Sequence, residues 1–314
     1  MAVDDIHEGG CLCGAVRYRA VAGDSGTVTH CFCRMCRKAS GGTFVTWVEF
    51  PAKDFVYTRG QPNHFRSSDL AERAFCGRCG GQLTFHAVAD PTDLGESIWV
   101  TLGATDRPGD IKPTHHIFND NRLARLHLDD QLPRWPSQLP WLRLEDELPR
   151  PTVRDESIER QRTMAAGDAH EGGCLCGSVR YRALVGDSKT AGHCHCAMCR
   201  KATGATLVSW IHVLAKGFAF TRGNPKIFKS SSIAERSFCA NCGCQFTFRF
   251  GGEAEHDTGS LWLTLGATDR PDDFEFTHHI FTADQLPWLN LDDGLKRWPG
   301  QLPWLRSDDS LTCR

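Results

Sequence analysis

The sequence lacks long hydrophobic runs and any marked excess of charge. No apolar stretch approaches the roughly 20 residues that a membrane-spanning helix needs, so no membrane partner is expected. The 36 basic and 38 acidic residues give a net charge of −2, and no basic block stands out. Because phosphate binding requires a clustered Lys/Arg surface, nucleic acid is not expected as a partner either.

A signal for export is also missing. The first residues, Met1-Ala2-Val3-Asp4-Asp5, are acidic and lack an apolar core, so we expect a cytoplasmic protein. In that compartment the 16 cysteines indicate metal binding rather than disulfides. Cysteines spaced C-x-C are, in addition, poorly placed to pair with each other.

Helical periodicity is scarce, since no stretch sustains it over a dozen residues. Period-two alternation predominates instead, over residues 16–20, 44–50, 82–87 and 98–102. Only a short helical turn after Cys33, through 37–39, is expected. The pattern predicts a fold that is mainly β.

The chain contains an internal repeat. A shift of 163 residues places Cys11 on Cys174 and His116 on His279 without a gap between them. We therefore predict two tandem domains, over 1–142 and 164–314, joined by a charged, proline-containing linker over 143–163. Because a head-to-tail fusion readily preserves an ancestral two-fold contact, the two copies are expected to form an intramolecular pseudo-dimer.

Each copy carries a cysteine triplet with the spacing C-x-C-x-x-C. This spacing brings three sulfurs around one point, and zinc is the metal that best suits soft thiolate ligands. Three ligands leave a fourth position, which we interpret as the active site; the alternative is a structural site that His30, His115 or His116 completes. The triplets, which are the candidate catalytic residues, are Cys31, Cys33 and Cys36, and Cys194, Cys196 and Cys199.

The remaining motif cysteines form two pairs in each copy. A C-L-C pair and a C-x-x-C-G pair together supply four thiolates, enough to close a zinc site that leaves no room for substrate. Such a closed site contributes folding energy. The predicted ligands are Cys11, Cys13, Cys76 and Cys79, and Cys174, Cys176, Cys239 and Cys242, so about two zinc ions are expected per domain.

The ordered motifs resemble those of the glutathione-dependent formaldehyde-activating enzyme (Gfa) family, which includes the centromere protein V-like proteins. The motifs are Gly-Gly-Cys-Leu-Cys-Gly (9–14), the triplet followed by Arg-Lys (31–38), Ser67-Ser68, Arg73-x-Phe-Cys-x-x-Cys-Gly (73–80) and His116-Ile117-Phe118. The resemblance implies an Mss4-like fold of twisted β-sheets, with a structural zinc on the outer pairs and a catalytic zinc on the triplet. It also implies a carbon–sulfur lyase that forms S-hydroxymethylglutathione from formaldehyde and glutathione.

Charge arguments agree with a small thiol as substrate. A zinc ion on three thiolates carries a net charge of −1 and acidifies bound water less than a three-histidine zinc, so a soft thiol suits the fourth position better. A zinc hydrolase and a non-catalytic zinc-binding interaction module remain alternatives. Glutathione carries two carboxylates, and the candidate cations for them are Arg37, Lys38, Arg59 and Arg73, with Arg200, Lys201, Arg222 and Arg236 in the second copy.

The two copies differ at positions next to these motifs. Phe32 and Arg34 of the first triplet become His195 and Ala197 in the second. Gly81 becomes Cys244, and the second copy has Trp288 where the first has Arg125. These differences leave open whether both copies act on the same substrate.

Overall fold

The structure is a computed structural model that describes residues 5–87, 96–138, 169–185, 190–250 and 259–302. The expected linker over 143–163 lies outside these residues, and so do the predicted domain boundaries, which stay predictions. No helix in the described part of the chain is long and apolar enough to cross a lipid bilayer.

The first copy has ten strands and one short α-helix among the described residues, joined partly by 3₁₀ turns. Their bounds are β1 Ile6–Gly10, β2 Arg17–Val21, β3 Val28–Cys31, α1 Arg34–Ser40, β4 Val45–Pro51, β5 Phe55–Arg59, β6 Asn63–Ser68, β7 Ala71–Phe75, β8 Gln82–Ala87, β9 Ser97–Thr101 and β10 His115–Ile117.

The second copy repeats this order, with one further short strand at its end. The bounds are β11 Ala169–Gly173, β12 Arg180–Leu184, β13 Thr190–Cys194, α3 Ala197–Thr203, β14 Val208–Leu214, β15 Phe218–Arg222, β16 Lys226–Lys229, β17 Ala234–Phe238, β18 Gln245–Phe250, β19 Ser260–Thr264, β20 Glu275–Ile280 and β21 Lys296–Arg297.

Each copy pairs a small sheet with a large one. The small sheets have the orders β1-β2-β5 and β11-β12-β15, and the large ones β10-β3-β4-β9-β8-β7-β6 and β16-β17-β18-β19-β14-β13-β20-β21. Strand β2 alternates buried and exposed side chains, as the period-two pattern predicts for a strand that covers a core. These sheets confirm a fold that is mainly β and built from two tandem copies.

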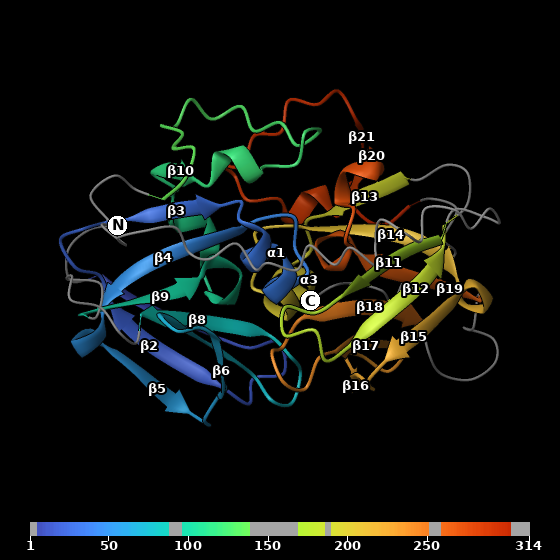
Figure 1. The fold of residues 1–314 in the computed structure, drawn as a ribbon. Coiled ribbons are helices and arrows are strands. Elements are labelled where there is room, and N and C mark those ends of the chain that lie inside the picture. The colour runs from blue at the N-terminus through green and yellow to red at the C-terminus, as the bar shows by residue number, and fades with distance from the viewer. Residues whose placement is uncertain (1–4, 88–95, 139–168, 186–189, 251–258, 303–314) are drawn as a thin grey trace.

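The two copies lie side by side, and their helices meet the partner copy in the middle of the molecule (Figure 1). Helix α1 packs on the turn Leu265–Ala267 of the second copy, and α3 packs on the equivalent turn Leu102–Ala104. Both helices end at glycines in the left-handed region, Gly41 and Gly204, whose carbonyl groups accept hydrogen bonds from the opposite copy. The helix ends therefore belong to the contact between the copies.

Four buried polar contacts across this boundary occur in matched pairs. The side-chain amides of Gln82 and Gln245 donate to the carbonyls of Cys242 and Cys79 in the opposite copy, each at 2.9 Å. Two buried hydroxyl contacts, Thr43 with Ser209 and Thr46 with Thr206, also cross it. Each contact is reciprocated by its equivalent, as in an interface that relates two copies by a two-fold axis.

Two ion pairs that are equivalent to each other also cross the boundary. Lys38 Nζ lies 2.7 Å from Asp269 Oδ1, and Lys201 Nζ lies 2.8 Å from Asp106 Oδ1. Burial lowers the pKa of Lys38, but the neighbouring carboxylate of Asp269 opposes this shift. The lysine that follows each triplet therefore serves the contact between the copies.

Candidate metal centres and active site

The four outer cysteines of each copy converge on one point, as predicted. The Sγ atoms of Cys11, Cys13, Cys76 and Cys79 all lie within 4.8 Å of one another, and those of Cys174, Cys176, Cys239 and Cys242 do the same. Neighbouring sulfurs are 3.4–3.7 Å apart where a pair is in contact. Zn–S bonds of about 2.3 Å in a tetrahedron place sulfurs about 3.8 Å apart, so the donor set fits a closed zinc site.

Local backbone turns build these clusters. Gly14 and Gly80 adopt positive φ values of 69° and 77°, which lets the chain turn directly after each cysteine pair. The turns direct backbone amides at sulfur: the N–H of Val16 donates to Cys11 Sγ at 3.3 Å, and that of Arg78 to Cys76 Sγ at 3.4 Å. Such hydrogen bonds stabilise thiolates, the form in which cysteine binds metal.

The triplet lies at the junction of β3 and α1. Cys31 ends the strand, and Cys33 is the N-cap of the helix, where its Sγ accepts a hydrogen bond from the N–H of Cys36 at 3.3 Å. The three sulfurs form a group within 4.8 Å, and their equivalents at Cys194, Cys196 and Cys199 form another. The strand-to-helix turn therefore gathers three soft donors on one side, which again fits zinc.

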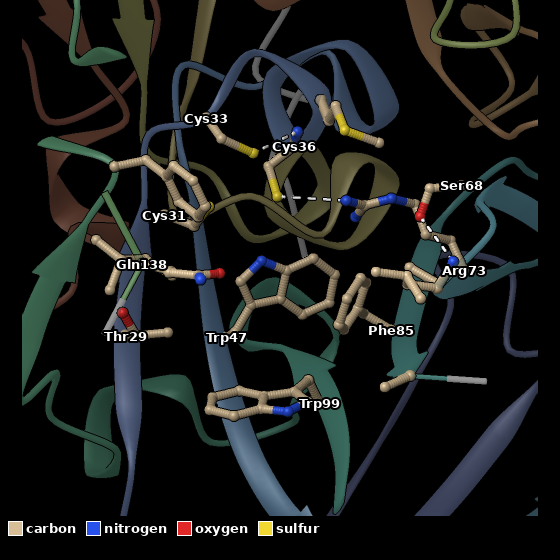
Figure 2. A pocket seen from close by; sticks show the side chains of 16 residues that line it. Thr29, Cys31, Cys33, Cys36, Trp47, Ser68, Arg73, Phe85, Trp99 and Gln138 are labelled. Atoms are coloured by element: carbon tan, nitrogen blue, oxygen red, sulfur yellow. Dashed lines mark hydrogen bonds between the residues drawn. The ribbon is translucent and has the colours of Figure 1, made fainter. Parts of the chain in front are cut away.

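A buried arginine accompanies each triplet. Arg73 Nη2 lies 3.5 Å from Cys36 Sγ, and the guanidinium packs over the rings of Trp47 and Phe85 (Figure 2). Burial by itself would lower the pKa of Arg73, but the thiolates of Cys36 and Cys33 outweigh it and keep the pKa above its ordinary value. Arg236 repeats this arrangement with Cys199 Sγ at 3.5 Å. A fixed positive charge therefore offsets the negative charge of the three thiolates.

The first triplet opens into a cavity of about 150 Å³. Side chains from strands far apart in the sequence line it, and most are apolar or aromatic: Thr29, Met35, Trp47, Ser68, Leu70, Ala71, Arg73, Phe85, Ala87, Trp99, Ile117, Phe118 and Gln138. Figure 2 shows the three cysteines at one end of this space and the rings of Trp47, Phe85 and Trp99 along it. Cys33 is partly exposed. A small molecule in the cavity would meet sulfur at one end and aromatic rings around it.

The histidines considered as a fourth ligand have other partners. His116 Nε2 lies 2.7 Å from Asp130 Oδ2, and His30 Nδ1 lies 2.7 Å from the hydroxyl of Thr46. Burial, together with the nearby His116, lowers the pKa of His30 to about 3, so its ring is neutral. His115 Nδ1 contacts Thr114 at 2.9 Å. Among the residues that the structure describes, no histidine joins the three triplet thiols, which favours the open site over a histidine-completed one.

Four of the eight cations proposed for the substrate carboxylates have structural partners instead. Arg37 donates to the carbonyls of Phe32 and Asn121, and Arg200 donates to the equivalent carbonyls of the second copy. The two lysines bind across the boundary between the copies, as described above. Arg59 is exposed and outside the cavity lining; of the first-copy candidates only Arg73 is among the lining residues.

The sequence did not point to the aromatic wall. Trp47, Phe85 and Trp99 lie on β4, β8 and β9; β8 and β9 follow one another in the chain, but only the sheet brings β4 next to β9. The sequence did carry one signal for part of this wall, the two-residue period of β-strands. Thr29 precedes Cys31 by two positions and therefore shares its face of β3, and Phe85 and Ala87 share a face of β8 in the same way.

Comparison with known proteins gives the same two units. The family model for the glutathione-dependent formaldehyde-activating enzyme matches residues 6–121 and 169–284. An uncharacterized lyase of Schizosaccharomyces pombe is 28% identical over 130 residues, 37% of this chain and 93% of that protein. A putative glutathione-dependent formaldehyde-activating enzyme of Halomonas elongata is 32% identical over 83 residues, 24% of this chain and 53% of that protein.

A crystal structure of a Rhodobacter sphaeroides protein also matches, at 18% identity and a TM-score of 0.28, over 41% of this chain and 98% of that one. Because this TM-score is low, we base no conclusion about the fold or the function on this match. The family match covers most of the chain, and each matched range contains one four-cysteine cluster and one triplet. The chain therefore belongs to the glutathione-dependent formaldehyde-activating enzyme family, as two copies of the family domain in tandem.

Proposed function

We propose that this protein catalyses the reversible addition of a thiol to an aldehyde, with glutathione and formaldehyde as substrates, and is in the reverse direction a carbon–sulfur lyase. In the forward reaction the thiol sulfur bonds to the carbonyl carbon, and the carbonyl oxygen takes the proton that the thiol gives up. The observation that carries the proposal is the triplet of thiols at the end of an aromatic cavity. The names of the two curated relatives agree with it.

The side chains of the first copy have distinct roles in this reaction. Cys31, Cys33 and Cys36 would hold a zinc ion, which supplies a soft electrophilic position that favours the thiolate form of a thiol. Arg73 keeps a positive charge beside the triplet, where negative charge on sulfur and oxygen develops. The rings of Trp47 and its neighbours exclude water, which strengthens these electrostatic interactions.

The test is an aldehyde panel assayed with and without glutathione. Turnover should require both formaldehyde and the thiol, and the double variant Cys33→Ser/Cys196→Ser should abolish it while the fold persists, because serine is a harder ligand that rarely ionises. Arg34→Ala is the matched control, since Arg34 is exposed next to Cys33 and the second copy has alanine there. Turnover without a thiol would favour a hydrolase, and turnover in the double variant would remove the triplets from catalysis.

We also propose four zinc ions per chain, two held tightly by the four-cysteine clusters and two held less tightly by the triplets. Metal analysis before and after mild chelation should give about four and then about two. A total of two or none in the untreated protein would contradict the assignment.

The reciprocal contacts support a further part of the proposal, that the two copies act as one intramolecular pseudo-dimer. Small-angle scattering should fit a single compact particle. Two bodies that tumble independently would contradict it.

A further inference from the structure

The two triplets have different surroundings, although their ligands match. Position 87, an alanine in the wall of the first cavity, corresponds to Phe250 in the second copy. The ring of Phe250 packs edge-on against Phe248 at 5.3 Å and Trp262 at 5.5 Å, centroid to centroid. Their equivalents, Phe85 and Trp99, line the first cavity. Phe250 therefore places an aromatic ring against the equivalents of two residues that line the first cavity, at a position where the first copy has only a methyl group.

A second wall differs independently. Thr29 lines the first cavity, and its equivalent in the second copy is Gly192. A Cβ atom added to Gly192 would lie only 2.1 Å from His278 Nε2, so the imidazole occupies the space of the missing side chain. His278 is opposite Gly192 in the pairing of β20 with β13, and Gly192 precedes Cys194 by two positions. The imidazole therefore lies on the face of the sheet that carries the triplet.

The exposure of the middle cysteine agrees with these substitutions. Cys33 is partly exposed, whereas the equivalent Cys196 is 1% exposed. The ligand sulfurs, the arginine and the helix N-cap are otherwise retained in both copies. The difference between the copies is thus one of access, since the metal-binding frame is the same.

We propose that only the first copy admits the thiol substrate, and that Phe250 and His278 close the second triplet to it. Ala87 and Phe250 are then the residues that determine which copy binds substrate. The proposal rests on the thiol chemistry of the proposed function. It assigns the second copy the role of a folded partner for the first, with a zinc site shielded from ligands.

The test is the stoichiometry of glutathione binding to the zinc-loaded full chain, measured by titration calorimetry. We expect one equivalent for the wild type and none for Ala87→Phe. The double variant Gly192→Thr/Phe250→Ala restores the walls of the first copy to the second, so we expect two equivalents. Zinc content and thermal unfolding of each variant verify that it has folded. A wild-type value of two, or Ala87→Phe that still binds one equivalent, would overturn the proposal.

Failure of the proposed function would have a different signature. If the wild type binds no glutathione, the proposed thiol substrate is wrong. A smaller thiol then tests separately whether the two triplets differ in accessibility. With cobalt in the triplets, 2-mercaptoethanol should perturb the visible spectrum in one fast and one slow phase of equal amplitude, and Phe250→Ala should accelerate the slow phase at least tenfold. A single phase for both cobalt ions in the wild type, or a slow phase unchanged by Phe250→Ala, would overturn the difference in access.

Discussion

The two copies of the domain share their metal-binding frame and differ in the walls around it. Both have a four-cysteine cluster, a triplet at a strand-to-helix turn and an arginine 3.5 Å from the last triplet sulfur. Ala87 and Thr29 line the first cavity, whereas the second copy has Phe250 and Gly192 at these positions, and the imidazole of His278 lies where a side chain at position 192 would be. We expect the cysteine positions to tolerate little change, because in the proposed sites each one would hold the metal. Wall positions can differ without changing the fold, and we infer that they set access to each triplet.

The largest expected difference between the copies follows from removing one cysteine of a four-cysteine cluster in only one of them. Cys79→Ser should unfold the first copy and Cys242→Ser the second, because the folding energy linked to a structural zinc, roughly 10–16 kcal/mol, is at least comparable to the stability of a domain. Calorimetric unfolding and zinc content measure the effect. Cys244→Ala is the control: Cys244 is buried beside the cluster but is not one of its four ligands, so its loss should cost only about 1–2 kcal/mol. Wild-type stability in Cys79→Ser would refute the structural role.

The contact between the copies is tested by adding one methyl group. A Cβ atom on Gly103 would lie 2.7 Å from backbone atoms of the second copy, including the carbonyl oxygens of Arg200 and Ala205. Gly103→Ala should therefore destabilise the protein by about 1–3 kcal/mol and expand it in scattering. Gly109→Ala is the matched control, because its Cβ would make an ordinary 3.4 Å contact with Pro287 of the second copy. Equal stability of the two variants would show that the copies do not pack in this way.

The arginines beside the triplets allow a comparison of metal retention with substrate binding. Arg73→Met should release zinc from the first triplet about tenfold faster, since groups that support metal ligands have effects of this size. Arg236→Met should do the same in the second copy and leave glutathione binding intact, because we infer that this triplet is closed to the thiol. Release into a chromophoric chelator gives the rates. Arg73→Lys, which keeps the charge, should recover part of the retention; unchanged release in Arg73→Met would exclude an electrostatic role.

The smallest expected effect concerns Asp106 and Asp269, the carboxylates that each bind an arginine of their own copy and a lysine of the other. The hydrogen bond from Arg17, aided by Lys201, lowers the pKa of Asp106 from its ordinary 3.8 to about 2. A lowered carboxyl pKa adds stability that is complete above about pH 4 and is lost as the pH falls towards 2. Asp106→Asn should therefore cost less than about 1 kcal/mol at pH 7 and still less at pH 3, measured by urea unfolding.

The equivalent variant in the second copy sharpens this result. Asp269 is less exposed than Asp106, with 20% against 37% of its side chain accessible, so Asp269→Asn should have the larger effect at pH 7. A cost that is the same at both pH values would show that these carboxylates do not contribute through their charge.

The sequence by itself determined the repeat, the mainly β class, the family and the four groups of cysteines. Short spacings such as Cys31-x-Cys33 confine sulfurs to one neighbourhood through covalent geometry, whatever the rest of the fold does. The alternation over 82–87 likewise predicted a strand, because side chains on a strand alternate between two faces. Local constraints of this kind can be read without any tertiary information.

Only the tertiary structure decided what surrounds those sulfurs. Trp47, Phe85 and Trp99 meet around the cavity because the sheet places β4, β9 and β8 side by side, an order that differs from their order in the chain. Lys38, proposed as a substrate-binding cation, binds Asp269 in the other copy, a contact that spacing within one copy cannot reveal. Pairing register and the packing of one copy on the other set these neighbours, so the grouping of the cysteines could be predicted and the walls could not.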